Sequence, residues 1–122
     1  MSDTAAPASN VVAVRQMSDY DVVALVERVL LEQSMVDRFA SHLEGIVRCG
    51  DAPKIIVSFA GVKHMSSSVL GAMIATHMAC ERQGGELRVA AVSPSLMEVF
   101  KVARLDKMLR FYRTVELAED GF

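Results

Sequence analysis

Apolar and polar residues follow two patterns along the chain, and each pattern predicts a different kind of element. Short continuous apolar runs are typical of strands buried in a sheet. Such runs occupy 11–14, 22–26, 54–59, 87–92 and 109–112. Apolar residues three or four positions apart are typical of amphipathic helices, and this spacing covers 35–47, 67–82 and 94–103. The predicted order of elements is therefore β-β-α-β-α-β-α-β.

Turn and capping residues predict where these elements begin and end. The residues 17–20 lie between the first two apolar runs, which predicts a β-hairpin. Ser34 is expected to cap the first helix, and Gly50 lies where a helix commonly stops. The pair Gly84-Gly85 is expected to end the second helix and turn the chain. Pro94 follows a serine, which is typical of a helix start.

Strands separated by helices of this length imply right-handed crossovers between parallel strands. We therefore predict an α/β fold with a mixed sheet of about four to five strands packed against three to four helices. A length of 122 residues is that of one domain. We expect residues 1–10 to form a flexible N-terminal tail, 11–117 the domain and 118–122 a C-terminal tail.

Charge narrows the classes of function. Thirteen basic and fifteen acidic residues give a formal net charge of −2, which argues against a dedicated nucleic-acid binder. No apolar stretch approaches the roughly 18–20 residues of a membrane span, and the N-terminus lacks the features of a signal peptide, so we expect a cytoplasmic protein. From Arg82 to Arg113, however, seven basic residues face three acidic ones. This local excess predicts either a solvated face or a docking surface for an acidic partner.

Little in the sequence points to metal or cofactor chemistry. Cys49 and Cys80 form no CxxC pair, so we expect two free thiols, with a single disulfide as the alternative. His42 and His77 lie in predicted helices without the spacing of metal ligands, and we expect packed or surface side chains. Glycine-rich phosphate-binding motifs are absent from the sequence. We therefore predict no metal and no cofactor.

Three consecutive serines, Ser66, Ser67 and Ser68, precede the second predicted helix. One hydroxyl is enough to cap a helix, which stabilises it by about 0.5–2 kcal/mol relative to alanine. Three leave at least one hydroxyl free at the surface, so the cluster is either a cap or a functional site. His64 nearby suggests a Ser–His nucleophile, but the G-x-S-x-G elbow is absent and we predict no enzyme.

Several segments in order resemble one known family. The strand and turn Ile55–Val62 are followed by His64–Gly71, which carries the serines and a Leu-Gly pair. Gln83–Val89 is similar to that family's Gly-Gly turn into the next strand, and Arg104–Met108 to its link from the last helix into a strand. Together they resemble the STAS domain, named for sulfate transporters and anti-sigma factor antagonists. The resemblance covers about Val11–Val115.

The resemblance implies a STAS-like fold and a bacterial regulatory protein without catalysis of its own. Stand-alone members bind an anti-sigma factor that is also a serine kinase, and phosphorylation of a serine at the helix start separates the complex. The matching acceptor here is Ser67, with Ser66 and Ser68 as neighbours. The partner-binding residues implied are His64, Met65, Ser66, Ser67, Ser68 and Val69.

Two positions depart from the family's pattern beside the acceptor. Ser66 stands where an acidic residue is usual, and Val69 stands where a glycine is usual. An alternative therefore stays open, in which the domain is a STAS-like sensor or scaffold that is not phosphorylated. It would bind a small ligand or other signalling subunits, with the serines acting as hydrogen-bond donors or caps.

Overall fold

The computed structural model describes residues 11–122 and contains an α/β fold with a mixed sheet and four helices. The strands are β1 (Val12–Gln16), β2 (Asp21–Leu25), β3 (Val29–Leu30), β4 (Lys54–Ser58), β5 (His64–Met65), β6 (Glu86–Ala90) and β7 (Arg110–Tyr112). The helices are α1 (Gln33–Cys49), α2 (Ser67–Arg82), α3 (Pro94–Val102) and α4 (Val115–Glu119). The predicted α/β class and the order of the eight predicted elements are confirmed; β3, β5 and α4 are additional.

Five strands form the main sheet in the order β1-β2-β4-β6-β7. β1 and β2 pair antiparallel as the predicted hairpin, and β2, β4, β6 and β7 run parallel. The parallel strands need crossovers because the end of one strand and the start of the next lie at opposite ends of the sheet. The helices α1, α2 and α3 supply these crossovers. β3 and β5 form a separate two-stranded parallel sheet.

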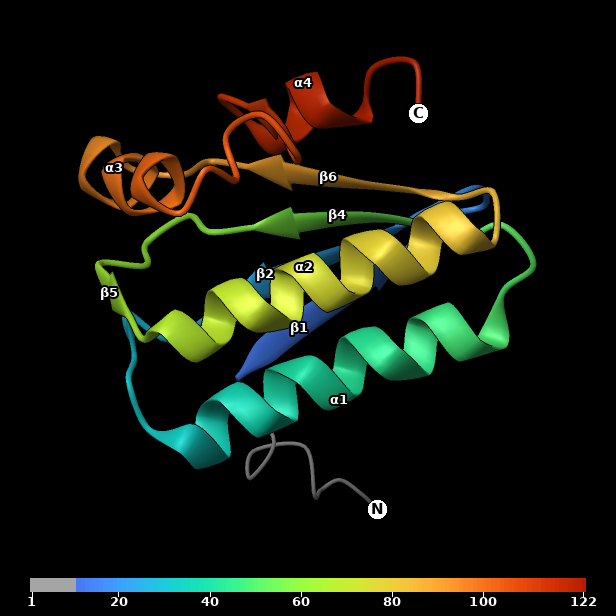
Figure 1. Cartoon of the computed structure of the whole chain (residues 1–122). Coiled ribbons are helices and arrows are strands. Elements are labelled where there is room, and N and C mark those ends of the chain that lie inside the picture. Colours follow the sequence, from blue (N-terminus) through green and yellow to red (C-terminus); the bar gives the residue numbers. More distant parts are fainter. Residues whose placement is uncertain (1–10) are drawn as a thin grey trace.

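The two faces of the main sheet are covered differently, as Figure 1 shows. α1 and α2 lie side by side on one face, which we call the inner face, and α4 lies on the opposite, outer face. Side chains alternate between faces along each strand. Val23, Val57 and Val89 are paired in register and belong to the large core on the inner face. Their neighbours Val22 and Ile56 belong to a small separate cluster that includes α4.

The apolar stripe of α1 buries its predicted face. Phe39 and Leu43 are fully buried against the sheet. The helix begins two residues earlier than expected, because Glu32 and not Ser34 holds the N-cap position. The backbone N–H groups of Met35 and Val36 donate to the Glu32 carbonyl. A backbone carbonyl thus begins the helix without a side-chain cap.

The Gly-Gly turn after α2 is confirmed and has a physical reason. The Gly84 N–H donates to the Glu81 carbonyl and the Gly85 N–H to the Cys80 carbonyl, the hydrogen bonds of a Schellman motif. Gly84 has φ of 75°, which suits glycine. At Gly85, a Cβ would clash with the Pro53 backbone, so no larger residue fits. The turn therefore delivers the chain into β6 directly beside β4.

The C-terminal residues differ from the expected tail. We predicted a tail from residue 118, but Ala118 is fully buried, and it lies within α4 on the outer face of the sheet. The five-residue helix is too short to show a helical period, which is why the sequence pattern did not predict it. The expected N-terminal tail, 1–10, lies outside the described residues.

Candidate functional site

The three serines lie where the chain leaves β4 and enters α2, at the carboxyl edge of the parallel strands. After β4 the chain turns at Gly61, whose φ is 85°, and then adds β5 to β3. The Ser66 N–H donates to the Leu30 carbonyl across 2.9 Å. The serine turn is therefore held by backbone bonds to a neighbouring segment, and α2 begins from a fixed point.

Each serine has a different environment. Ser66 holds the N-cap position, but its side chain makes no capping hydrogen bond, and its buried Oγ has no partner among the described residues. Ser67 is the first residue of α2 and is exposed. Ser68 is exposed and its hydroxyl donates to Gln33 Oε1 across 3.2 Å. Capping therefore does not explain the serines, and an approaching protein can reach both Ser67 and Ser68.

The other predicted site residues divide between surface and core. His64 is exposed and Met65 is half-buried. Val69 lies fully buried under α2, so its side chain packs in the core and contacts no partner. Val69 is therefore not part of the partner-binding surface that the resemblance implied. A valine at this helical position faces inward because Leu70, the next residue, and Met73, one turn on, are buried on the same apolar side.

An apolar groove of about 280 Å³ begins beside this turn. Its floor and walls are Leu31, Lys63, His64, Met65, Ser95, Leu96 and Val99. Leu31 is 56% exposed and Val99 is 40% exposed, so the groove presents apolar surface to solvent. The groove joins the small β3–β5 sheet to the start of α3. It therefore connects residues that are about 30–70 positions apart in sequence into one surface, which reaches to within two residues of Ser67 along the chain.

The sequence pattern did not predict this groove. Val99 belongs to the apolar spacing over 94–103, but it is exposed, and the buried residues of α3 are Leu96 and Phe100. Leu31 follows a strand of two residues, which is too short to show an alternating pattern. The only available signal was the apolar residue Leu31 between a predicted hairpin and a helix.

The electrostatics of the turn favour an anion. The first turn of α2 contains no acidic residue, and its backbone N–H groups and dipole carry partial positive charge. Lys63 and His64 lie in the adjoining groove. Among residues 11–122 none of the three serines is hydrogen-bonded to a histidine, so the turn holds no assembled nucleophile and base.

The cysteines and remaining histidines lie away from this site. Both cysteines are free; Cys49 is exposed and Cys80 is buried. Burial raises the pKa of the Cys80 thiol to about 11, because the thiolate would lose its hydration. His42 and His77 are both half-buried on helices. Within the described range, no group of three His, Cys, Asp or Glu side chains could hold a metal ion.

The basic excess of the last third does not form one surface. Arg88 and Arg110 lie on the outer face of the sheet, where both contact Glu86. Lys101 instead pairs with Glu98 on α3.

None of the helices between residues 11 and 122 has the length and apolarity that crossing a bilayer requires.

The sequence and the fold were compared with known protein families and solved structures. The STAS domain family model matches residues 31–118. The fold is similar to that of an anti-sigma factor antagonist (STAS) domain protein from Planctomyces limnophilus, with a TM-score of 0.78 at 21% identity, covering 88% of this chain and 92% of that one. An anti-sigma factor antagonist from Mycobacterium paratuberculosis gives a TM-score of 0.75 at 19% identity, covering 88% of both chains.

A third similar structure is the Bacillus cell fate determinant SpoIIAA in its phosphorylated form. It has a TM-score of 0.71 at 18% identity and covers 89% of this chain and 97% of that one. At these identities the likeness concerns the fold. The chain belongs to the STAS domain family and resembles the anti-sigma factor antagonists in structure.

Proposed function

We propose that this protein is a bacterial, cytoplasmic anti-sigma factor antagonist without catalysis of its own. It binds an anti-sigma factor that has serine kinase activity, and phosphorylation of Ser67 ends the complex. The observation that carries the proposal is an exposed serine at the first position of a long helix, two residues after Met65, which lines an exposed apolar groove. SpoIIAA, which has a similar fold, has a phosphorylated form.

The groove offers the kind of surface that a protein partner covers. Leu31 and Val99 present exposed apolar area, and Met65 adds a flexible side chain to the same lining. Lys63 and His64 lie at the same groove and would orient an acidic rim on the partner. The partner surface thus includes His64, Met65, Ser66, Ser67 and Ser68 together with the groove.

Phosphate on Ser67 would act on the partner and leave the fold intact. It adds about −1.5 to −2 charges at pH 7 and three acceptor oxygens. At the N-terminus of α2 this charge meets free N–H groups and the positive end of the dipole. Against an apolar or acidic partner surface it brings desolvation and repulsion. A loss of about 1.4 kcal/mol is enough to weaken binding tenfold.

The experiment is phosphorylation by purified anti-sigma factor serine kinases with ATP, followed by peptide mass spectrometry. We expect modification at Ser67 in wild type and none there in Ser67→Ala. Ser67→Asp should bind the kinase at least tenfold more weakly than wild type. A matched control is Ser18→Asp, an exposed serine of the β1–β2 turn at the opposite edge of the sheet. If Ser67 is never modified and Ser67→Asp binds as well as wild type, the proposal fails.

A second candidate function is a STAS sensor or scaffold that is not phosphorylated. Ser66 favours it, because its Oγ is buried without a hydrogen-bond partner where the family usually has an acidic residue. Such a hydroxyl is free to bind a ligand or a subunit group. A small molecule that raises the melting temperature of wild type, but not of Ser66→Ala, would support this function over the switch.

A further inference from the structure

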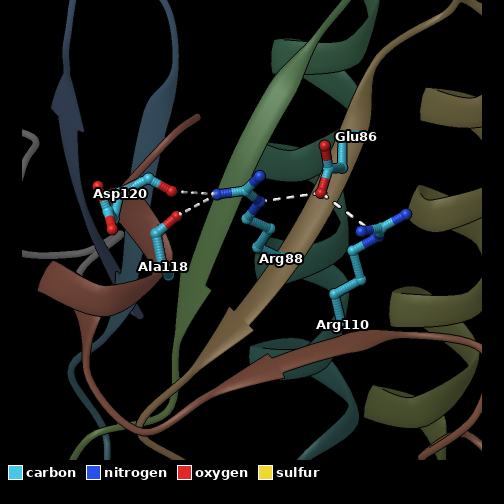
Figure 2. Close-up of polar contacts among 5 residues, drawn as sticks. All are labelled: Glu86, Arg88, Arg110, Ala118 and Asp120. Atoms are coloured by element: carbon cyan, nitrogen blue, oxygen red, sulfur yellow. Dashed lines mark hydrogen bonds and ion pairs between the residues drawn. The ribbon is translucent and has the colours of Figure 1, made fainter.

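The outer face of the sheet carries a concentration of positive charge. Four strands each place one basic side chain on it: Arg15 from β1, Lys54 from β4, Arg88 from β6 and Arg110 from β7. Glu86 is the acidic side chain that contacts Arg88 and Arg110 there (Figure 2). The local charge is therefore +4 − 1 = +3 within a chain whose total is −2.

The segment Thr114–Phe122, which we call the C-terminal segment, lies over this face. Its sequence contains three acidic residues, Glu116, Glu119 and Asp120, and no basic one. Its charge of −3 thus equals in size and opposes that of the face beneath it. Charge complementarity of this kind selects and orients partners at protein interfaces.

Arg88 is the main polar anchor of the segment. Its side chain is 10% exposed. Its Nη1 donates to the Ala118 carbonyl across 2.7 Å and to the Asp120 carbonyl across 3.1 Å, as Figure 2 shows. Its Nε donates to Glu86 across 2.9 Å. The carbonyls at the end of a helix lack partners within it, and a cation there also meets the negative end of the dipole.

Phe122 and Glu119 supply two further anchors. The Phe122 ring centroid lies 4.1 Å from the Arg88 guanidinium carbon and 5.8 Å from Lys54 Nζ. Its ring also packs against that of Tyr20, with centroids 5.5 Å apart. The Tyr20 hydroxyl donates to Glu119 Oε2 across 2.6 Å. An acidic residue and an aromatic residue three positions later are thus both recognised by the face.

The segment is held by a small apolar cluster, in which its Val115 and Phe122 are only partly buried. Ala118 is its fully buried residue, and the cluster beneath it adds Val22, Ile56 and Ala90. Leu117 is 51% exposed. A helix of five residues has little stability of its own. Such an attachment, built from a few polar bonds and ring contacts, opens more readily than the core.

We propose that the outer face is a binding surface for an acidic peptide segment of a partner protein, and that the C-terminal segment occupies it as an internal competitor. Arg88 receives the carbonyl oxygens of the incoming peptide. Arg15 and Tyr20 receive an acidic side chain, and Lys54 and Arg88 receive an aromatic ring. The face lies across the sheet from α2 and Ser67, so this proposal is independent of the phosphoserine switch.

The test uses the full chain and a fluorescein-labelled peptide of sequence TVELAEDGF, which copies residues 114–122. The double variant Glu119→Ala/Phe122→Ala weakens the internal competitor. We expect it to bind the peptide at least tenfold more tightly than wild type does, with affinity that falls as salt is raised. Adding Arg88→Met to the double variant should abolish the gain, and adding Ser67→Asp should leave it unchanged.

Two controls test whether the outer face binds an acidic peptide specifically. The neutral peptide TVQLAQNGF should bind at least tenfold more weakly than the acidic peptide. Because the chain has no tryptophan, Phe122→Trp gives a second readout in an otherwise intact chain. The acidic peptide should shift its emission to longer wavelength as the ring is displaced.

Four results would overturn the proposal. They are equal binding to wild type and the double variant, equal binding of the neutral peptide, equally strong competition by an oligodeoxythymidine, and dimerisation of the double variant without peptide. The last two would identify the occupant as a general polyanion or as a second copy of this chain.

Discussion

The two faces of the central sheet are both covered, but by different chemistry. On the inner face, α1 and α2 bury a continuous apolar core in which Phe39, Leu43 and Met73 have no exposed surface. On the outer face, a five-residue helix is attached mainly through Arg88. The helices α1 and α2 are therefore part of the hydrophobic core, whereas the C-terminal segment is attached to the outer face through polar contacts of the kind that hold a bound peptide.

This difference separates stability from recognition. Apolar burial contributes roughly 25 cal/mol per Å² of surface and has no direction, so the inner face determines whether the chain folds. Hydrogen bonds and charge contacts add little net stability, but they require partner groups at defined positions. The outer face therefore selects the chemistry of the segment that binds to it. Substitutions on the inner face should therefore cost more stability than substitutions on the outer face.

The largest effect should come from the inner face. Phe100 is fully buried and its ring contacts those of Phe59 and Phe111, with centroids 5.7 Å and 5.0 Å apart. Phe100→Ala removes these ring contacts and leaves a cavity in the core, and we expect it to lower the free energy of unfolding by about 3–5 kcal/mol. Urea denaturation followed by circular dichroism measures this loss.

The outer face provides the matched control for that variant. Leu117 is a half-exposed apolar residue of α4, and Leu117→Ala should change stability by less than about 0.5 kcal/mol. A cost below about 2 kcal/mol for Phe100→Ala would show that the inner core is looser than its packing implies.

A smaller loss is expected when the outer cover is detached. Arg88→Met removes the donor to the Ala118 and Asp120 carbonyls, which then turn to water. We expect a loss of about 2 kcal/mol, limited by the free energy with which the segment is attached. Hydrogen exchange should accelerate within 114–122 more than in β4 and β6.

Arg110→Met is the control for this variant, because Arg110 contacts the same Glu86 from a side chain that is 69% exposed. It should cost less than about 0.5 kcal/mol, as exposed ion pairs do. If Arg88→Met and Arg110→Met cost the same, Arg88 is not an anchor and the comparison between the faces loses its basis.

A pH dependence should come from the inner face. The pKa of Cys80 is raised from 9.0 to about 11, because burial disfavours the thiolate. Above pH 9 the unfolded chain loses this proton while the folded chain keeps it, so stability falls between pH 9 and 11, by at most about 1.4 kcal/mol per pH unit. Cys80→Ala should flatten this slope and Cys49→Ala, at an exposed position, should not. Equal slopes in both variants would assign the loss to other groups.

The sequence predicted the inner face well and the outer face poorly, for one physical reason. Periodic apolar positions reveal burial against a core, and 54–59, 67–82 and 87–92 carry that signal strongly. Arg88 carries none of it: a charged residue inside an apolar run gives no indication that its guanidinium is buried. Its partners are backbone carbonyls, which every residue type has.

The candidate site was predicted in part for a related reason. The serines were found because three adjacent hydroxyls are a local feature of the sequence. Whether a side chain at the helix start faces out or in depends on rotation about the helix axis, and Ser67 and Val69 differ in just this respect. The groove combines segments distant in sequence, so only the folded chain brings Leu31 beside Val99.

The smallest effect concerns the pKa of Tyr20, which reports whether the outer cover is in place. The Tyr20 hydroxyl donates to the Glu119 carboxylate, and this bond, with burial and the nearby negative charge, raises the pKa of the phenol above its usual value. Glu119→Gln should therefore lower that pKa, whereas Glu116→Gln, an exposed acid of the same helix, should not. Ultraviolet titration in a Tyr112→Phe background observes Tyr20 alone, since the chain has two tyrosines.

Arg88→Met should lower the pKa of Tyr20 as well, because a C-terminal segment that detaches as one body removes Glu119 from the Tyr20 hydroxyl. An unchanged Tyr20 in that variant would mean that the anchors act separately, and an incoming acidic peptide would then have to displace them one at a time.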